Sequence, residues 1–176
     1  MDPDVMKGRP LKVYNRCQEI LYVAAFLDRS AGTCEDVLDP RQIPGTQGQQ
    51  EWYVYDQRGG CVEKYDRERG FSYTLSPGEA RLFQFIPAKG PVCVIGMTDK
   101  YISGAGVQEI RMFEDSCVLQ TRCGGTLSLV SERSRIRQVM IRRQKTGICM
   151  EADWLQEGLI IRIGDLQAGD VVQVFW

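Results

Sequence analysis

Short runs of β-branched and aromatic residues, many of them alternating apolar with polar positions, recur along the chain from residue 11 to residue 176. Such alternation is typical of strands that bury one face. Gly, Pro and Asp separate the runs and favour turns. About fourteen strands are predicted, over residues 11–15, 19–28, 51–56, 61–65, 71–75, 80–87, 91–97, 107–113, 117–122, 126–131, 136–143, 147–152, 159–164 and 171–176.

This pattern predicts an all-β fold, a two-sheet antiparallel β-sandwich of jelly-roll or Greek-key type. A length of 176 residues predicts a single domain over residues 1–176. Residues 29–50, rich in Gly, Pro and Gln, are predicted to form a long surface loop. Apolar positions on several runs are expected to face the core: Tyr73, Leu75, Leu82, Phe85, Ile136, Val139 and Ile141.

The chain has no histidine and seven cysteines. The lack of histidine excludes Ser-His and Cys-His nucleophile pairs and Cys₂His₂ zinc sites. The cysteines are odd in number and contain no CxxC pair, and Cys93 and Cys149 lie in apolar runs, where small buried side chains are expected. No metal and no cofactor are predicted. Without an apolar signal-peptide core or a run of transmembrane length, a reducing, cytoplasmic location is expected.

The net charge of −1 offers no basic field for a phosphate backbone, so nucleic acid is not expected as a partner. No membrane partner is expected either, because no run approaches transmembrane length. The local arginine cluster at residues 133–143 is interpreted as a solvated strand face. Glycosidase chemistry needs two carboxylates at a fixed separation. No pair stands out among the candidates, which are Asp99, Glu109, Glu114, Asp115, Glu151 and Asp153.

Aromatic and loop residues provide the candidate ligand site. Trp52 lies on one face of its predicted strand and Tyr53 and Tyr55 on the other, so one set points outward unless both faces are covered. An exposed set could stack on sugar rings, and a covered set would pack beneath the 29–50 loop or a partner. Trp154, beside Asp153, allows the same two interpretations, and Trp176 is expected to close the core.

Asp99 and Lys100 lie in a glycine-rich stretch, residues 96–106, that lacks the spacing of a phosphate-binding loop. The favoured interpretation is a loop that needs positive φ between two strands. Asp99 and Lys100 would then be an ion pair or would cap the bend.

Several segments, read in order, resemble one enzyme group. Asp2-Pro3, Gly8 and residues 11–15 resemble the stretch D-P-x-x-x-G-x-x-x-L-K-I-W-N of the raffinose synthase and alkaline α-galactosidase branch of glycoside hydrolases, related to family thirty-six. Residues 82–89 are similar to its E-L-F-T-V-x-P-V-K, and residues 95–107 to its P-I-G-L-x-D-M-F-N-S-G-G-A-V. Residues 122–131 resemble R-G-C-G-R-F-G-x-Y-S-S.

The resemblance implies a C-terminal β-sandwich that follows a catalytic (β/α)₈ barrel, which carries the catalytic carboxylates of this group. It therefore implies no catalytic residue here. The expected function is that of a non-catalytic accessory domain that packs on such a barrel in cis or in trans, with self-association where the barrel-facing surface is exposed. The alternatives are a stand-alone module that binds galactosides through Trp52, Tyr53 or Tyr55, and a small enzyme with paired carboxylates.

Overall fold

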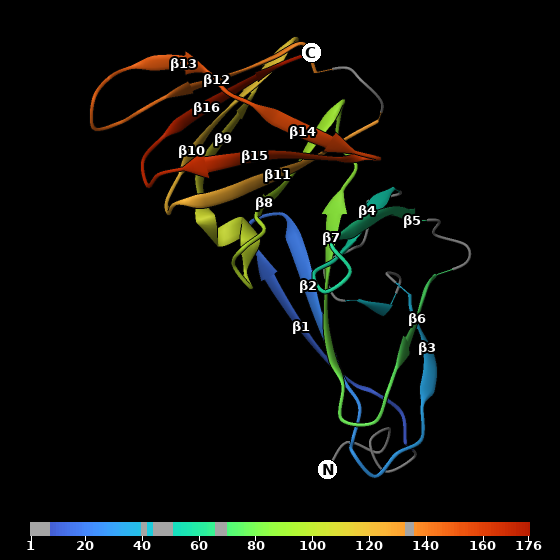
Figure 1. Cartoon of the computed structure of the whole chain (residues 1–176). Coiled ribbons are helices and arrows are strands. Elements are labelled where there is room, and N and C mark those ends of the chain that lie inside the picture. Colours follow the sequence, from blue (N-terminus) through green and yellow to red (C-terminus); the bar gives the residue numbers. More distant parts are fainter. Residues whose placement is uncertain (1–7, 40–41, 44–50, 66–69, 133–135) are drawn as a thin grey trace. The chain divides into compact units, whose positions relative to one another are not determined.

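The computed structural model describes residues 8–39, 42–43, 51–65, 70–132 and 136–176, and these form an all-β fold of antiparallel sheets (Figure 1). The all-β sandwich-type fold is therefore confirmed. Every predicted strand is present, with ends that differ by a few residues. The chain divides into two compact units, residues 1–88 and 89–176, each with its own core. A single domain over residues 1–176 stays a prediction.

The first unit is a five-stranded antiparallel sheet whose inner face packs against a two-stranded ribbon. The aromatic side chains of Tyr73 and Phe83 join the two layers, with ring centroids 5.0 Å apart. The sheet runs in the order β1 (Leu11–Cys17), β2 (Ile20–Phe26), β7 (Ala80–Pro87), β4 (Trp52–Asp56) and β5 (Cys61–Tyr65). The ribbon consists of β3 (Cys34–Leu38) and β6 (Phe71–Leu75).

The second unit is a two-sheet sandwich, in which the apolar side chains of both sheets form one core. A short 3₁₀ helix, η2 (Ser103–Gly106), connects the sheets. One sheet runs in the order β13 (Cys149–Glu151), β12 (Gln138–Arg142), β16 (Val171–Phe175), β10 (Ser116–Thr121) and β9 (Val107–Met112). The other consists of β14 (Trp154–Glu157), β15 (Ile160–Leu166), β11 (Gly125–Ser131) and β8 (Val92–Met97).

Two strands lie where none is predicted, β3 and β14. β3 occupies part of the predicted 29–50 loop, so that prediction is wrong for residues 34–38, while residues 40–41 and 44–50 lie outside the described residues. Its sequence is unusually acidic for a strand, but Asp36 has two partners, Lys12 on β1 of the facing sheet and Tyr73, the residue paired with it on β6. The Lys12 ammonium lies 2.7 Å from its carboxylate, and the Tyr73 hydroxyl donates to it at 2.8 Å.

These contacts make the stability of the first unit depend on pH. Burial opposes ionisation of Asp36, but hydrogen bonds from Lys12, Tyr73 and the Val37 main chain outweigh it and lower the pKa of Asp36. The folded state therefore favours the ionised carboxylate. Its stabilising contribution is present above the unfolded-state pKa, near 4, and is lost as the pH falls through the lower folded-state pKa.

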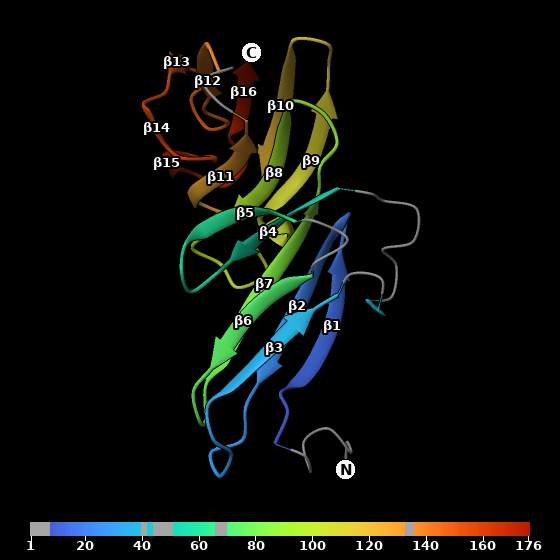
Figure 2. The ribbon, with the colours of Figure 1, turned by 90° about the vertical axis from the view of Figure 1, so that its right-hand side faces the viewer.

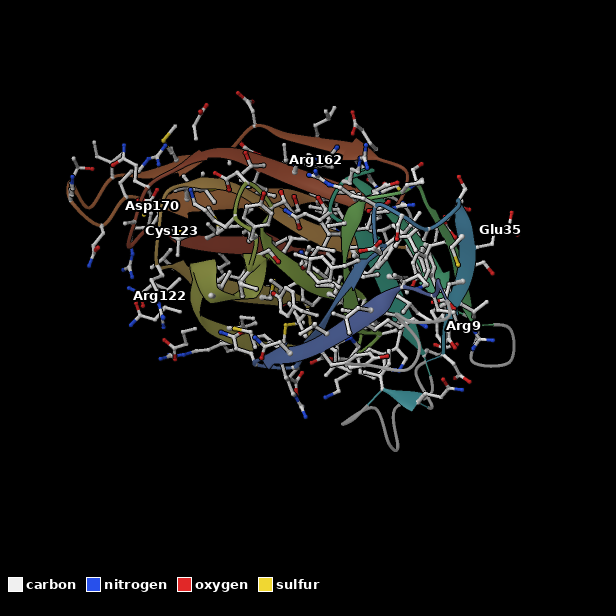
Figure 3. The ribbon with its side chains drawn as sticks, turned by 90° about the horizontal axis from the view of Figure 1, so that it is seen from below. Arg9, Glu35, Arg122, Cys123, Arg162 and Asp170 are labelled. Carbon is white, nitrogen blue, oxygen red and sulfur yellow. The ribbon has the colours of Figure 1, made fainter. Side chains whose placement is uncertain are left out.

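We expect Asp36→Asn to reduce the free energy of unfolding by about 1–2 kcal/mol at pH 7, because it weakens hydrogen bonds to a charged group. Urea unfolding of both proteins between pH 7 and about pH 3 should show the difference shrinking below about pH 4. The neighbouring exposed residue gives the control, Glu35→Gln, which should leave stability nearly unchanged (Figure 3). A difference independent of pH would contradict this account of Asp36.

Most of the residues predicted to face the core are buried: Tyr73, Leu75, Phe85, Ile136, Val139 and Ile141. Leu82 is only partly buried, because it lies on the opposite face of its strand from Phe83 and Phe85. Trp176 packs against the core of the second unit, as predicted. In the arginine cluster Arg137 and Arg142 are exposed, and Arg133 and Arg135 lie outside the described residues. The interpretation as a solvated face is wrong for Arg143, which is partly buried and pairs with Asp170.

The glycine-rich stretch at residues 103–106 is a 3₁₀ helix, and none of its residues has positive φ. The prediction of positive φ within the stretch 96–106 is therefore wrong for residues 103–106 but confirmed at Gly96. The glycines permit close packing instead: a Cβ on Gly106 would lie 2.4 Å from Cγ of Met97. Positive φ occurs in the adjoining strand, at Gly96, where φ is 106°.

Candidate functional site

The aromatic residues predicted as a sugar-stacking platform are buried in the structure. Trp52 is 3% exposed, Tyr53 5% and Tyr55 4%. Trp52 belongs to the core of the first unit. Tyr53 and Tyr55 lie on the opposite face of the sheet, and at β4 the side chains on that face are buried as well. Of the two interpretations of these residues, the covered one is therefore confirmed and the exposed stacking platform is wrong.

Asp99 and Lys100 form the predicted ion pair, with 3.5 Å between the ammonium nitrogen and the carboxylate. Asp99 also accepts a hydrogen bond from the Thr126 main-chain N–H at 3.4 Å. A Cβ on Gly125 would lie 2.1 Å from the Asp99 carboxylate, so glycine lets the carboxylate approach the start of β11. The structure thus brings these two residues together as capping groups of a bend in the second unit, whereas Trp52, Tyr53 and Tyr55 belong to the first unit.

A groove with a volume of about 450 Å³ lies in the second unit, among β11, β12, β13, β14 and β15. These C-terminal strands, apart from β11, are drawn in orange to red in Figure 1. Strands β13 and β14 are the edge strands of the two facing sheets, and residues 152–153 connect them. The lining residues are Thr126, Ile141, Arg143, Met150, Glu151, Ala152, Asp153, Trp154, Leu155, Arg162, Gly164 and Asp165.

The groove combines an apolar base with charged groups. Ile141 and Ala152 are buried, and the half-buried indole of Trp154 packs against the core. The Arg143 guanidinium is held in place by the Asp170 carboxylate, at 2.5 Å, and by the Asp165 carbonyl oxygen, at 2.9 Å. An aromatic face beside orienting polar groups is the arrangement with which proteins bind small polar ligands such as sugars.

Charged residues complete the rim of this groove. Arg162 pairs with Glu157, and both Glu151 and Asp153 are exposed (Figure 3 labels Arg162 and Asp170). The sequence singled out Trp154 beside Asp153, but it gave no indication that Arg143 or Arg162 lies nearby. Arg143 directly follows β12, and Arg162 lies on β15. These two strands belong to different sheets, so the two arginines come together only when the sandwich folds.

The buried carboxylates of the described chain have structural roles. Asp56 is 3% exposed, pairs with Arg81 and accepts the Arg58 main-chain N–H at 3.1 Å. Asp170 is 1% exposed and pairs with Arg143. Among the described residues no group of three or more Cys, Asp or Glu side chains is arranged to hold a metal ion.

All seven cysteines are free thiols, but they differ in burial. Cys93 is buried as predicted, and Cys117 is fully buried. Burial raises the pKa of Cys93 and raises the pKa of Cys117 to about 12. Cys149 is exposed, as is Cys61, so the prediction of a buried Cys149 is wrong. Its strand, β13, is a short edge strand with all three residues exposed.

Alkylation with iodoacetamide at about pH 8 should therefore distinguish the thiols, because the thiolate is the reactive form. We expect Cys61 and Cys149 to react at least about 100-fold faster than Cys93 and Cys117 in the native protein. Mass spectrometry of peptides over time measures these rates, and urea-unfolded protein is the control, in which the rates should converge. Equal rates in the native protein would contradict the burial of Cys93 and Cys117.

The outer face of the first unit's sheet carries an apolar patch, here called the Phe26 patch. Phe26 is 43% exposed and Val13 49%. The strand registers place Leu11, Phe26 and Ala80 in one row and Val13, Ala24 and Leu82 in the next, all pointing to the same face. All six side chains of the Phe26 patch are exposed or partly exposed.

No protein-family model matches the chain, and no curated protein matches its sequence. The resemblance to the raffinose synthase and alkaline α-galactosidase branch of glycoside hydrolases thus stays a prediction from the residues quoted for it. No helix in the described ranges has the length and apolar character needed to cross a lipid bilayer.

Proposed function

We propose that the chain is the non-catalytic accessory β-sandwich of an α-galactosidase-like or raffinose-synthase-like glycoside hydrolase, and that its Phe26 patch packs on the catalytic (β/α)₈ barrel. One observation carries the proposal. The segment that resembles the junction between barrel and sandwich, residues 11–15, is β1, and β1 supplies Leu11 and Val13 to the Phe26 patch. The sequence resemblance and the exposed apolar surface therefore coincide on one strand.

The chemistry of the Phe26 patch suits a large, flat partner. It consists only of aliphatic and aromatic side chains on three adjacent strands, without a charged group among the six. Apolar sheet faces of this kind usually mark interaction surfaces. Burial of the exposed parts of Val13 and Phe26 would contribute about 1 kcal/mol or less each, and the remaining four side chains would add to this.

The buried carboxylates support a non-catalytic role, because Asp56 and Asp170 are held in ion pairs with arginines. The carboxylates of a glycosidase instead face the scissile bond across a cleft. The free thiols support the cytoplasmic, reducing location that is part of the proposal.

The activity test uses nitrophenyl α-galactoside as substrate. The chain alone should give no turnover above buffer. Addition of the chain to an alkaline α-galactosidase barrel that lacks its own C-terminal sandwich should prolong the activity of that barrel at elevated temperature, because a covered apolar surface resists unfolding. Turnover by the chain alone would contradict a non-catalytic role, and an unchanged lifetime of the barrel would contradict the accessory role.

A second candidate function is carbohydrate binding in the groove, favoured by the half-buried Trp154 beside Arg143, Glu151 and Asp153. Titration with raffinose or galactose up to tens of millimolar should then change tryptophan fluorescence, and Trp154→Ala should abolish the change. Tyr101, an aromatic residue 81% exposed and outside the groove lining, provides the control Tyr101→Ala, which should retain it. No response in the wild-type chain would remove this candidate.

A further inference from the structure

Strand β9 is an uncovered edge of the second unit's five-stranded sheet. In the part of the chain that the structure describes, its one sheet neighbour is β10 (Figure 2). Residues 108–113 are all exposed, with Met112 at 47% and Phe113 at 54%. An exposed edge with apolar side chains offers unpaired main-chain N–H and C=O groups to another strand. Nothing in the Phe26 patch or the groove involves β9.

The main-chain hydrogen bonds identify which residues of β9 point to this open edge. The Phe113 N–H donates to the Ser116 carbonyl oxygen at 2.8 Å. Hydrogen-bonded and non-hydrogen-bonded pairs alternate along an antiparallel ladder, so the main-chain groups of Arg111 also face β10. Those of Ile110 and Met112 point away from β10, to the open edge.

The side chains of β9 are divided between the two faces of the sheet. Ile110 pairs with Leu119 and Met112 with Cys117, and both partners are buried in the core. Ile110 and Met112 therefore extend the apolar core face beyond the part that is covered, and Ile110 is 37% exposed. On the opposite face the Arg111 guanidinium donates to the Glu109 carboxylate at 2.7 Å.

The outward main-chain groups and the charges of β9 are self-complementary when two copies of the strand are centred on Ile110. If two copies of β9 align antiparallel with Ile110 opposite Ile110, the outward main-chain groups of both meet, and each Glu109 lies opposite an Arg111 of the other copy. A register centred on Glu109 would place the two Glu109 carboxylates opposite each other. A register centred on Arg111 would place the two Arg111 guanidinium groups opposite each other. Like charges directly opposite destabilise a strand pair, so the charges select the register centred on Ile110.

We propose that β9 pairs with β9 of a second copy of this chain, in the antiparallel register centred on Ile110. The pairing continues the five-stranded sheet across a two-fold axis and satisfies the outward main-chain groups. It also brings the exposed core-face side chains, Ile110 and Met112, beside those of the second copy. The inference concerns a surface separate from the Phe26 patch and does not depend on the proposed glycoside-hydrolase function.

The test measures the molar mass of the full chain by sedimentation equilibrium between about 1 μM and 1 mM, the range expected for a small interface. The wild-type chain should shift from monomer to dimer across this range. Two single variants, Glu109→Arg and Arg111→Glu, should each weaken the dimer at least tenfold, since they place like charges opposite each other. Both residues are exposed, and circular dichroism checks that each variant remains folded.

Two further samples test the register itself. An equimolar mixture of the two single variants should form a heterodimer as strongly as the wild-type chain, because each arginine then meets a glutamate of the other chain. The double variant Glu109→Arg with Arg111→Glu should dimerise by itself. A wild-type chain that stays monomeric throughout the range overturns the proposal, and so does a mixture that dimerises no better than the single variants.

Discussion

Replacement of Asp170 by alanine should lower the free energy of unfolding by about 3–5 kcal/mol, because it leaves a partly buried arginine without its counter-charge. The Asp170 carboxylate accepts hydrogen bonds from Arg143 at 2.5 Å and from the Gln167 main-chain N–H at 2.8 Å. The Asp170 main-chain oxygen accepts the Thr121 N–H at 2.9 Å, which connects this turn to β10. The substitution would remove both side-chain bonds at a residue that is 1% exposed.

Urea unfolding followed by fluorescence measures this effect, and an exposed acid of the same unit provides the control, Asp153→Ala, which should change stability by less than about 0.5 kcal/mol. A second comparison distinguishes the loss of the ion pair itself from the cost of leaving the Arg143 guanidinium without a counter-charge. The double variant Asp170→Ala with Arg143→Met should be less destabilised than Asp170→Ala alone, because no unpaired guanidinium remains. Equal losses for Asp153→Ala and Asp170→Ala would contradict a structural role of the pair.

Gly96→Ala should be comparably severe, with a loss of about 2–6 kcal/mol. Gly96 has a φ of 106°, which L-residues adopt only with strain of about 1–3 kcal/mol. A Cβ there would lie 2.3 Å from the Ser103 main-chain oxygen, and this rigid contact adds an overpacking cost of about 1–3 kcal/mol. Relief by movement of η2 would disturb the bond from the Ser103 hydroxyl to the Ile95 carbonyl oxygen, at 2.6 Å.

Gly90 provides a matched control for this substitution. Its φ is 93°, but a Cβ there would meet no atom within 4 Å. Gly90→Ala should therefore cost only the backbone strain, and the difference between the two variants in urea unfolding measures the contact between β8 and η2. Equal losses would show that the close approach of Ser103 contributes nothing.

Sequence periodicity predicts the strands that bury one face, and alternating runs such as residues 71–75 and 171–176 express this directly. Strands buried on both faces, such as β4, are predicted from their β-branched and aromatic residues instead. β3 and β14 escape the prediction because their stability comes from the strands beside them. β3 contains the acidic residues Glu35 and Asp36, and it is stabilised by its pairing with β6 and by the contacts of Asp36 with Lys12 and Tyr73. β14 has four residues and pairs with β15.

The site was less predictable than the fold. The alternation at residues 52–55 shows which side chains share a face, but it cannot show whether the second face is covered, so the sequence leaves open that Tyr53 and Tyr55 are buried, as the structure shows them to be. The groove around Trp154 joins side chains from five strands of two sheets, and local sequence carries no information on such long-range proximity. Asp99 and Lys100 were predictable as an ion pair because they are neighbours in the chain.

The most direct test of the proposed accessory role is the binding of the chain to an alkaline α-galactosidase barrel that lacks its own C-terminal sandwich. Sedimentation velocity should show a complex with the wild-type chain, and Phe26→Glu should weaken it at least tenfold by placing a charge in the Phe26 patch. Tyr101→Glu, which changes an exposed aromatic residue outside the Phe26 patch, should bind like the wild-type chain. No complex with the wild-type chain, or equal binding by Phe26→Glu, would contradict the account.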